Sequence, residues 1–220
     1  MKKFGAIFDM DGTLIDNNAY HFEAWKAVFE KYKHMPVSFE LYNEKMSGVP
    51  GMTVMREFFP EYTEDEMQRV FEEKSQTYKD AFAPFAAPIN GLERLLMEFK
   101  NAGIKMAIAS SATVANINFI LEHVPIRQYF DAIVDGPRIS KPKPNTQIFL
   151  KAAEDLGIKP EDCIVFEDSI SGIKAGRAAG MKVVAITSTH SAQELPPSDL
   201  AVTDYTGLSL QKLAALFEEN

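Results

Sequence analysis

The chain has 220 residues, of which 46% are hydrophobic and 11% aromatic, and its formal net charge is −8. This length suffices for one large domain, or for a core domain that carries a smaller insert. The negative charge opposes a nucleic-acid-binding surface, and no apolar run approaches the roughly 20 residues that cross a membrane. The single cysteine, Cys163, excludes an internal disulfide. We expect a cytoplasmic, monomeric protein with no membrane or nucleic-acid partner.

The N-terminal segment is an apolar run that ends in acidic residues. Residues 4–8 predict a short buried strand, and Asp9, Asp11 and Gly12 follow it. Ligands of open α/β sheets bind at the carboxyl edge of the strands. Asp9 and Asp11 are two residues apart and point to the same side of an extended chain. Because two neighbouring anions are costly without a cation, this pair predicts a site for Mg²⁺, which prefers oxygen ligands.

The next segment, residues 17–84, contains only helical patterns. Apolar spacing predicts helices over 16–34, 38–46, 52–59 and 63–82. Ser38 is a candidate N-cap, and Thr63 with Glu66 three residues later fits a capping box. A breaker-rich loop separates the second of these helices from the third. We interpret residues 17–84 as an all-helical cap domain inserted into another fold.

From residue 85 onward, strands alternate with helices. The expected strands are 105–109, 132–134, 163–166, 182–186 and 200–202. The expected helices are 92–102, 113–123, 145–156, 171–179 and 209–218. This alternation predicts a doubly wound, Rossmann-like parallel sheet. The predicted fold is therefore an α/β core formed by 1–16 and 85–220, with the helical domain 17–84 inserted.

Four predicted strand ends carry polar residues, and such ends meet at one edge of a parallel sheet. These residues are Asp9 and Asp11, Ser110 followed by Ser111, Lys141, and Glu167 followed by Asp168. Phosphoryl transfer needs a nucleophile, a proton donor for the leaving oxygen, and positive charge near the transferring oxygens. In this set Asp9 would attack, Asp11 would protonate the leaving group, and Lys141 with Mg²⁺ would offset the charge.

Each of these residues also has an ordinary structural interpretation. A serine after a strand often caps a helix, and Lys141 in a proline-containing loop is typical of a solvated side chain. Glu167 and Asp168 at a strand end are typical of residues that cap the next helix. Only their joint occurrence, in this order along the chain, favours a catalytic site.

Taken together, these segments resemble the four motifs of the haloacid dehalogenase superfamily. The motifs are residues 8–14, Ser110, Lys141-Pro142, and residues 167–169 with Gly172. The resemblance covers nearly the whole chain. It implies that Asp9 is a nucleophile that forms an aspartyl-phosphate, and that Asp11 is the general acid and base. It also implies Mg²⁺ bound by Asp9, Asp168 and the backbone carbonyl of Asp11, with Glu167 binding the metal or orienting its water.

The position of the helical insert resembles that in β-phosphoglucomutase and related sugar-phosphate phosphatases. His21 matches a cap-hinge pattern of this subgroup, and Lys74 stands where a cap lysine is expected. The resemblance implies that His21 and Lys74 contact the substrate, and we expect the same of Asn17 and Ser47. The alternatives are that His21 is a partly buried helix residue and that Lys74 belongs to a charged run on the surface.

Departures from the mutase pattern bear on the reaction. The mutase loop reads Lys-Gly-Val-Ser-Arg where this chain has residues 47–51, Ser-Gly-Val-Pro-Gly, and Val114 replaces an expected Asn. A second phosphate group needs fixed cationic donors, for which Lys45 and Arg56 are the nearby candidates. Asn145 replaces an Asp that is usual in the third motif.

We therefore expect a Mg²⁺-dependent phosphatase for a small phosphorylated metabolite. A sugar phosphate is the expected substrate class, with pyrophosphate as a further candidate. The first alternative is a mutase of the β-phosphoglucomutase type. The second is a non-catalytic binding module, which the presence of Asp9, Asp11 and Asp168 opposes.

Overall fold

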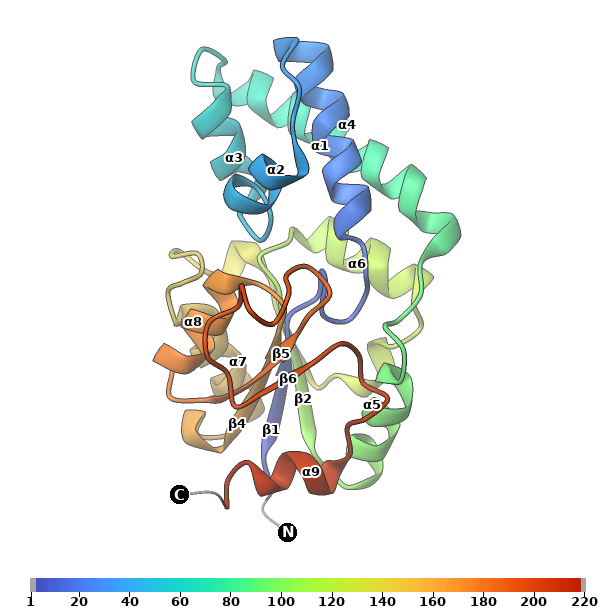
Figure 1. Cartoon of the computed structure of the whole chain (residues 1–220), viewed down its shortest axis with the longest axis vertical. Helices are drawn as coiled ribbons and strands as arrows, with labels where there is room; N and C mark the ends of the chain where they lie inside the picture. Colours follow the sequence, from blue (N-terminus) through green and yellow to red (C-terminus); the bar gives the residue numbers. More distant parts are fainter. Residues whose placement is uncertain (1–2, 219–220) are drawn as a thin grey trace. The chain divides into compact units, whose positions relative to one another are not determined.

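The computed structural model describes residues 3–218, which divide into two compact units (Figure 1). The first unit contains the chain up to Asp16 and from Ala87 onward. The second unit is Asn17–Ala86. Within the described residues, no helix combines the length and the apolar character that crossing a membrane requires.

The first unit is built on a six-stranded sheet with the order β3-β2-β1-β4-β5-β6, and all paired strands are parallel. The strands are β1 (Gly5–Phe8), β2 (Lys105–Ala109), β3 (Ala132–Val134), β4 (Cys163–Glu167), β5 (Lys182–Ile186) and β6 (Leu200–Val202). Because β1 lies between β2 and β4, the strand order reverses beside β1, which is where doubly wound sheets bind ligands. The predicted doubly wound α/β core is confirmed.

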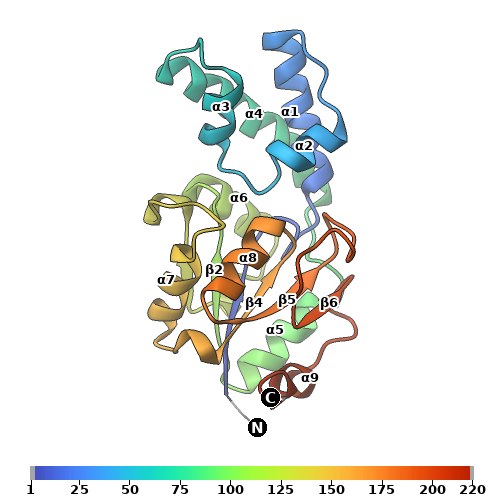
Figure 2. The same ribbon diagram turned by 60° about the vertical axis from the view of Figure 1, so that its left-hand side comes forward.

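Helices cover both faces of the sheet (Figures 1 and 2). α7 (Gln147–Leu156) and α8 (Ile170–Ala178) pack with Ile7 and Val165 on one face. α5 (Leu92–Asn101) lies on the opposite face, where the ring of Phe99 is 6.5 Å from that of Phe166. Successive strand residues point to opposite faces, so the apolar run of each strand is buried on both sides.

Two further helices complete the first unit. They are α6 (Val114–His123) and α9 (Leu210–Ala215), and α9 packs beside α5. The last helix is shorter than the predicted 209–218. Arg94 of α5 holds the segment before α9 by donating to the carbonyl oxygens of Tyr205 and Leu208.

The second unit is helical throughout its ordered elements. These are α1 (Asn18–Lys33), α2 (Phe39–Lys45), α3 (Gly51–Phe58), α4 (Glu64–Phe82) and a 3₁₀ turn, Ala83–Phe85. Ser38 caps α2 and the predicted capping box of Thr63 and Glu66 opens α4, so both expectations are confirmed. Trp25, Phe29 and Val54 belong to an apolar cluster contained within this unit. We refer to this unit below as the helical insert.

Candidate active site

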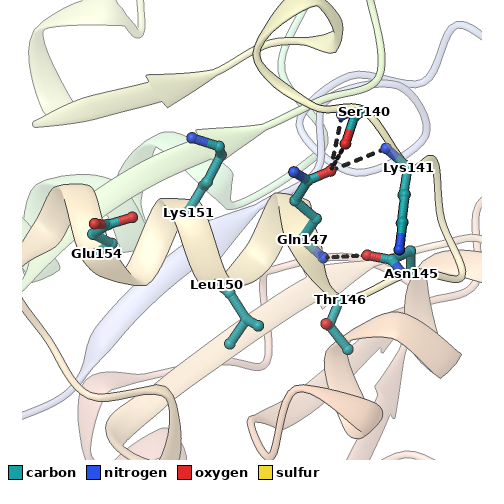
Figure 3. A pocket seen from close by; sticks show the side chains of 8 residues that line it. All are labelled: Ser140, Lys141, Asn145, Thr146, Gln147, Leu150, Lys151 and Glu154. Atoms are coloured by element: carbon teal, nitrogen blue, oxygen red, sulfur yellow. Dashed lines mark hydrogen bonds between the residues drawn. The ribbon is translucent and has the colours of Figure 1, made fainter.

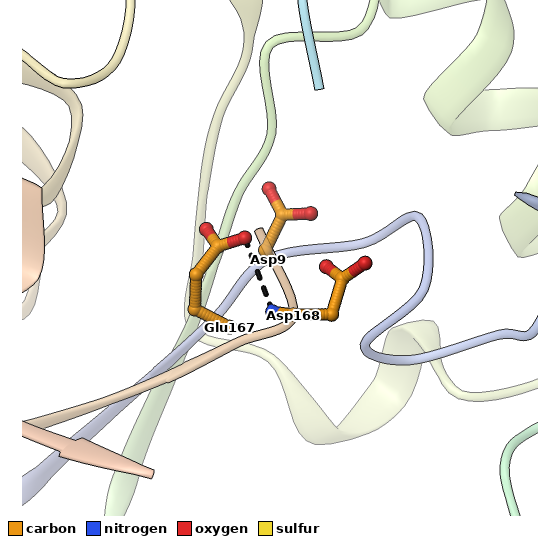
Figure 4. Close-up of side chains that lie close together, drawn as sticks. All are labelled: Asp9, Glu167 and Asp168. Carbon is orange, nitrogen blue, oxygen red and sulfur yellow. Dashed lines mark hydrogen bonds between the residues drawn. The ribbon is translucent and has the colours of Figure 1, made fainter. Parts of the chain in front are cut away.

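Three carboxylates gather at the carboxyl edge of the sheet, beside β1 (Figure 4). Asp9 follows β1, Glu167 ends β4, and Asp168 is the next residue. The strand register pairs Phe8 with Phe166, and the backbone N–H of Asp9 donates to the Phe166 carbonyl at 3.0 Å. Oxygens of the three carboxylates lie within 4.8 Å of one another, and all three residues are buried. Strand pairing therefore creates this carboxylate cluster from two distant parts of the chain.

Lys143 supplies the positive charge of the carboxylate cluster. Its Nζ donates to Oδ1 of Asp9 at 2.5 Å and to Oε2 of Glu167 at 2.7 Å. Its side chain is only 5% exposed. The sequence analysis expected Lys141 in this role, and the structure corrects that expectation, because Lys141 is exposed on the outer part of the same loop.

Lys141 was predicted in place of Lys143 because the loop contains two Lys-Pro pairs, 141–142 and 143–144. The first pair matched the expected motif, but the second pair lies closer along the chain to the start of α7. A loop that joins a strand to a helix is brought back toward the core by the helix. The lysine nearer to the buried residues Ile148 and Phe149 was therefore the better candidate.

Hydrogen bonds from three hydroxyl groups and two backbone amides orient the carboxylates. Thr13 Oγ1 donates to Oδ1 of Asp168 at 3.1 Å, and Thr189 Oγ1 donates to Oδ2. Oε1 of Glu167 accepts the backbone N–H of Asp168 at 3.2 Å, and both the N–H and the hydroxyl of Ser169 at 3.0 and 2.8 Å. Because Lys143 occupies Oε2, both oxygens of Glu167 are engaged by protein groups.

Two glycines leave the space that these carboxylates occupy. Gly12 has φ +72°, and a Cβ there would lie 2.1 Å from Oδ2 of Asp168. A Cβ at Gly172 would lie 2.0 Å from Oε2 of Glu167. The glycines of the first and fourth predicted motifs are therefore required by close approach of a carboxylate.

Burial makes the charged form of these carboxylates costly. The pKa of Asp9 is raised to about 8, chiefly by burial, although Lys143 opposes the shift. The pKa of Asp168 is raised well above its ordinary value by burial and then by the charges of Glu167 and Asp9. The ring of Phe8 stacks on that of Phe166 with centroids 4.3 Å apart. These two rings lie on the strands that carry the carboxylate cluster. The rings keep water away from the buried side of the cluster.

The donor set suits Mg²⁺. It consists of carboxylate oxygens, the ligands that this hard cation prefers, and within the described part of the chain the three buried carboxylates pair with a single lysine, Lys143. Asp9 and Asp168 would bind the ion, whereas Glu167 is held by protein groups and would orient the metal's water. Asp11 is half-buried and lies outside the carboxylate cluster. Binding through the backbone carbonyl of Asp11 stays a prediction.

The two serines after β2 lie at the same edge of the sheet. Ser110 is buried, its N–H donates to the Val134 carbonyl at 3.0 Å, and its Oγ accepts the N–H of Ala112 at 3.1 Å. The buried Oγ of Ser111 has no hydrogen-bond partner in the part of the chain that the structure describes. The hydroxyl of Ser111 is thus a donor for which the protein supplies no acceptor.

The expected residues of the helical insert form a group around α1 and α4. Nζ of Lys74 lies 2.7 Å from Nδ1 of His21, and Lys74 is 4% exposed. The His21 ring stacks on Tyr78 with centroids 3.8 Å apart, and Asn17 Nδ2 donates to the Tyr78 hydroxyl at 2.7 Å. Lys74 also lies over the ring of Trp25. The interpretation of Lys74 as a surface residue in a charged run is therefore wrong.

The other polar residues of the helical insert lie in different surroundings. Ser47 is half-buried, and its hydroxyl donates to Asn18 at 3.5 Å. Arg56 forms two 2.9 Å hydrogen bonds with Glu64, and Lys45 lies 3.6 Å from the neighbouring glutamate. The two cations that sequence analysis considered for a second phosphate group are thus paired within the insert.

Sequence analysis missed other residues of the site besides Lys143. Thr189 and Ser188 follow β5, and Ser188 Oγ donates to the carbonyl of Gly12. Tyr205 is fully buried and its hydroxyl donates to the Thr13 carbonyl at 2.9 Å. Burial, and then the charges of the carboxylate cluster, raise the pKa of Tyr205 well above its ordinary value. These contacts join segments far apart in sequence, and no local pattern indicates them.

Comparisons with known proteins agree with this geometry. Residues 6–186 match the family model described as haloacid dehalogenase-like hydrolase. A β-phosphoglucomutase from Bacillus subtilis (strain 168) is 33% identical over 221 residues, which cover 97% of this chain and 95% of that protein. A phosphorylated carbohydrates phosphatase from Thermotoga maritima is 34% identical over 181 residues, 80% of this chain and 81% of its own. The solved structure of a β-phosphoglucomutase from Clostridium difficile has a TM-score of 0.87 at 28% identity, and the match covers 99% of this chain and 98% of that one.

Proposed function

Because the chain belongs to the haloacid dehalogenase-like hydrolase family, we propose that it is a Mg²⁺-dependent phosphatase that hydrolyses a small sugar phosphate. One observation carries the proposal. Asp9, at the end of β1, is held by Lys143 within a buried carboxylate cluster that contains Glu167 and Asp168. A nucleophile, a fixed cation and an oxygen-only site for a hard metal therefore stand together where the strand order reverses.

In the proposed reaction, Asp9 is the nucleophile. Lys143 binds its Oδ1, so that Oδ2 is the oxygen that attacks phosphorus. The bond from phosphorus to the leaving oxygen breaks as the bond to Asp9 forms, and Asp11 gives its proton to that oxygen. Water then attacks the aspartyl-phosphate while Asp11 takes the water's proton, which releases phosphate and restores Asp9. Bound Mg²⁺ would supply positive charge that favours the ionised carboxylate and offsets charge on the transferring phosphoryl group.

The serines after β2 support binding of the transferring group. The buried hydroxyl of Ser111 lacks an acceptor among the described residues, and a phosphoryl oxygen is an acceptor. Ser110 has its own role, because its Oγ accepts the N–H of Ala112 and shapes the turn. We assign Ser111 to phosphate binding and Ser110 to the form of the loop that presents it.

The helical insert is proposed to select the substrate. We assign this role to His21, Lys74, Asn17 and Ser47, as the sequence indicates. The pairing of Arg56 with Glu64 and of Lys45 with its neighbour supports a substrate with a single phosphate group. A cation that already pairs with a carboxylate is a poorer donor for a second phosphate.

The competing function is a β-phosphoglucomutase-type mutase. The relative from Bacillus subtilis favours it, and so does the contact between Lys74 and His21, because sequence analysis expected these residues at the mutase positions. The loop 47–51 opposes it, since it contains no Lys or Arg. The two functions predict different products, so one experiment separates them.

The test is ³¹P NMR of the purified protein with Mg²⁺ and a panel of substrates. The panel contains β-glucose 1-phosphate with a trace of bisphosphate, several hexose and pentose phosphates, and pyrophosphate. Inorganic phosphate from a sugar phosphate supports the proposal, and phosphate from pyrophosphate alone would change the substrate class. Conversion of the C1 signal to the C6 signal without free phosphate would establish the mutase.

A matched variant tests the nucleophile. Asp9→Asn keeps the shape of the side chain and removes the attacking carboxylate, so Mg²⁺-dependent phosphate release should disappear. Asp135→Asn is the control, because this half-buried aspartate caps the short turn Gly136–Arg138 and lies outside the carboxylate cluster. Full activity of Asp9→Asn would refute the aspartyl-phosphate mechanism.

A further inference from the structure

We propose that Gln147, the first residue of α7, is a positioning residue for Lys143. It folds the loop 140–146 so that Lys143 reaches Asp9 and Glu167. The inference rests on the proposed function for the importance of Lys143 to the reaction, but the positioning itself is a property of the loop. Nothing in the sequence patterns singled out Gln147.

The side-chain oxygen of Gln147 accepts three hydrogen bonds from the start of the loop. Oε1 of Gln147 accepts the backbone N–H of Ser140 at 2.9 Å, the Ser140 hydroxyl at 3.2 Å and the backbone N–H of Lys141 at 3.0 Å (Figure 3). One side-chain oxygen therefore binds both residues at the start of the loop. Both ends of the loop, residues 140–141 and residue 145, are therefore hydrogen-bonded to Gln147, the first residue of α7.

Hydrogen bonds also hold the other end of the loop, next to α7. Oδ1 of Asn145 accepts the backbone N–H of Gln147 at 3.0 Å, and the Asn145 N–H donates to the Pro142 carbonyl at 3.0 Å. The next two residues, Ile148 and Phe149, are fully buried. Gln147 thus ties both ends of the loop to a helix that the core holds in place. Counted from Lys141, Asn145 is the position where the family usually has Asp, whereas counted from Lys143 that position is Gln147.

The side chain of Lys143 points in a different direction from its neighbours in the loop. In the loop, Ser140, Lys141, Pro142 and Pro144 are exposed, whereas the side chain of Lys143 is 5% exposed. Lys143 therefore lies in the middle of the segment that Gln147 closes and points inward. A misplacement of about 1 Å in such a group can cost on the order of 10²-fold in rate.

A merely structural role for Gln147 is distinguishable from positioning. Ser140 and Lys141 are exposed, so water can replace the lost acceptor when the Gln147 oxygen is removed. The fold should then keep most of its stability while the loop loses its fixed path. We expect the effect to appear at Lys143 and in the rate.

The first experiment measures the position of Lys143 without using activity. The intact protein is treated briefly with an amine-acetylating reagent, and the modification of each lysine is measured by mass spectrometry. In the wild-type protein Lys143 should be modified far more slowly than Lys141. Gln147→Met, which keeps the length of the side chain but has no acceptor oxygen, should raise Lys143 modification about fivefold or more through local opening.

Two further variants complete this experiment. Gln147→Glu keeps an accepting oxygen and should preserve the protection of Lys143. Lys151→Ala is the matched control, because Lys151 lies one turn further along α7. It lines the same pocket as residues 140–141 and 145–147, which form the other side (Figure 3). Unchanged protection of Lys143 in Gln147→Met, or equal loss in Lys151→Ala, would overturn the proposal. Gln147→Ala serves in place of the Met variant if the latter does not fold.

The second experiment measures the rate with the substrate found by ³¹P NMR. Gln147→Met should lower kcat/KM by about 10- to 100-fold, and Gln147→Glu should restore most of it. In a Lys143→Met background the same change at Gln147 should have almost no further effect. An equal loss in both backgrounds would show that Gln147 does not act through Lys143. If the wild-type protein hydrolyses nothing, the proposed function fails, and the acetylation result decides the positioning by itself.

Discussion

Replacing Lys143 by Met, with Lys141→Met as the matched control, tests which lysine of the loop serves the reaction. The two changes remove the same charge two residues apart, each before a proline. Lys143 makes two short ion pairs and is almost fully buried, whereas Lys141 is exposed. Only the first change should leave the nucleophile without a partner.

The structure sets the size of the expected effect. Removing one partner of a buried ion pair lowers the free energy of unfolding by about 3–5 kcal/mol, because the other charge remains buried and unpaired. Burial, the main cause, already raises the pKa of Asp9 to about 8 against the opposing effect of Lys143. Loss of Lys143 therefore raises this pKa further and removes part of the ionised nucleophile at neutral pH. Because misplacement of a catalytic group by about 1 Å can cost on the order of 10²-fold in rate, we expect kcat/KM to fall by about 10²-fold or more.

The assay is phosphate release at saturating Mg²⁺, measured at pH 7 and pH 9. Lys141→Met should stay within about twofold of wild type, as is usual for exposed charges. At limiting Mg²⁺, Lys143→Met should lose less activity at pH 9, since more of the metal-free Asp9 is ionised there and can bind the ion. The reasoning is refuted if Lys141→Met costs more activity than Lys143→Met, or if the two variants are equal.

Three further predictions concern residues around the site. Thr189→Val should weaken Mg²⁺ binding by about 10- to 100-fold, since it removes a hydrogen bond to Asp168, a proposed metal ligand. Calorimetry measures this affinity, and an affinity equal to that of wild type would exclude this role for Thr189. Gly172→Ala should destabilise the protein by about 1–3 kcal/mol in urea, since its Cβ would overlap Glu167, whereas Gly207→Ala, with open space around it, should not. Burial, the main cause, raises the pKa of Cys163 to about 12, so a thiol reagent at pH 8 should label the native protein about 10³-fold more slowly than the urea-unfolded chain, because the thiolate is the reactive form. Fast labelling of the native protein would show that this thiol is accessible.

The fold could be predicted because it depends on patterns that are local in sequence. Each strand of the core is a short apolar run, and each following helix has an apolar face and a glycine or a capping residue at its end. Pairing of Phe8 with Phe166 then follows from the parallel order of the strands. This is why Asp9, Glu167 and Asp168 could be placed at one edge before the structure was known.

The residues that complete the site depend on contacts between distant segments. Thr189 reaches Asp168 from the loop after β5, and Tyr205 reaches the carbonyl of Thr13 from near the C-terminus. A threonine after a strand and a tyrosine before a helix have no distinctive local pattern. Their roles follow only from the path of each loop, which side-chain hydrogen bonds determine.

The choice between Lys141 and Lys143 shows how such a path is set. Both lysines precede a proline and carry the same charge, and only their distance from the start of α7 along the chain distinguishes them in the sequence. The loop turns Lys143 inward because Gln147 binds the amides of residues 140 and 141. A hydrogen bond between a loop and a helix thus decides which of two similar side chains enters the site. In other proteins, too, we expect that the sequence alone will not show which lysine of a loop with repeated Lys-Pro pairs points into the site.

The charges of the carboxylate cluster favour a second cation beside Lys143. Strand pairing brings Asp9, Glu167 and Asp168 together whether or not their charges are balanced, and among residues 3–218 only Lys143 forms an ion pair with them. Burial and mutual repulsion raise the pKa of both aspartates, so the ionised cluster costs the fold free energy. A divalent cation bound there would recover that free energy by favouring the ionised forms. The same imbalance that weakens the metal-free fold would therefore favour binding of the proposed Mg²⁺ beside the carboxylate that is proposed to attack the substrate.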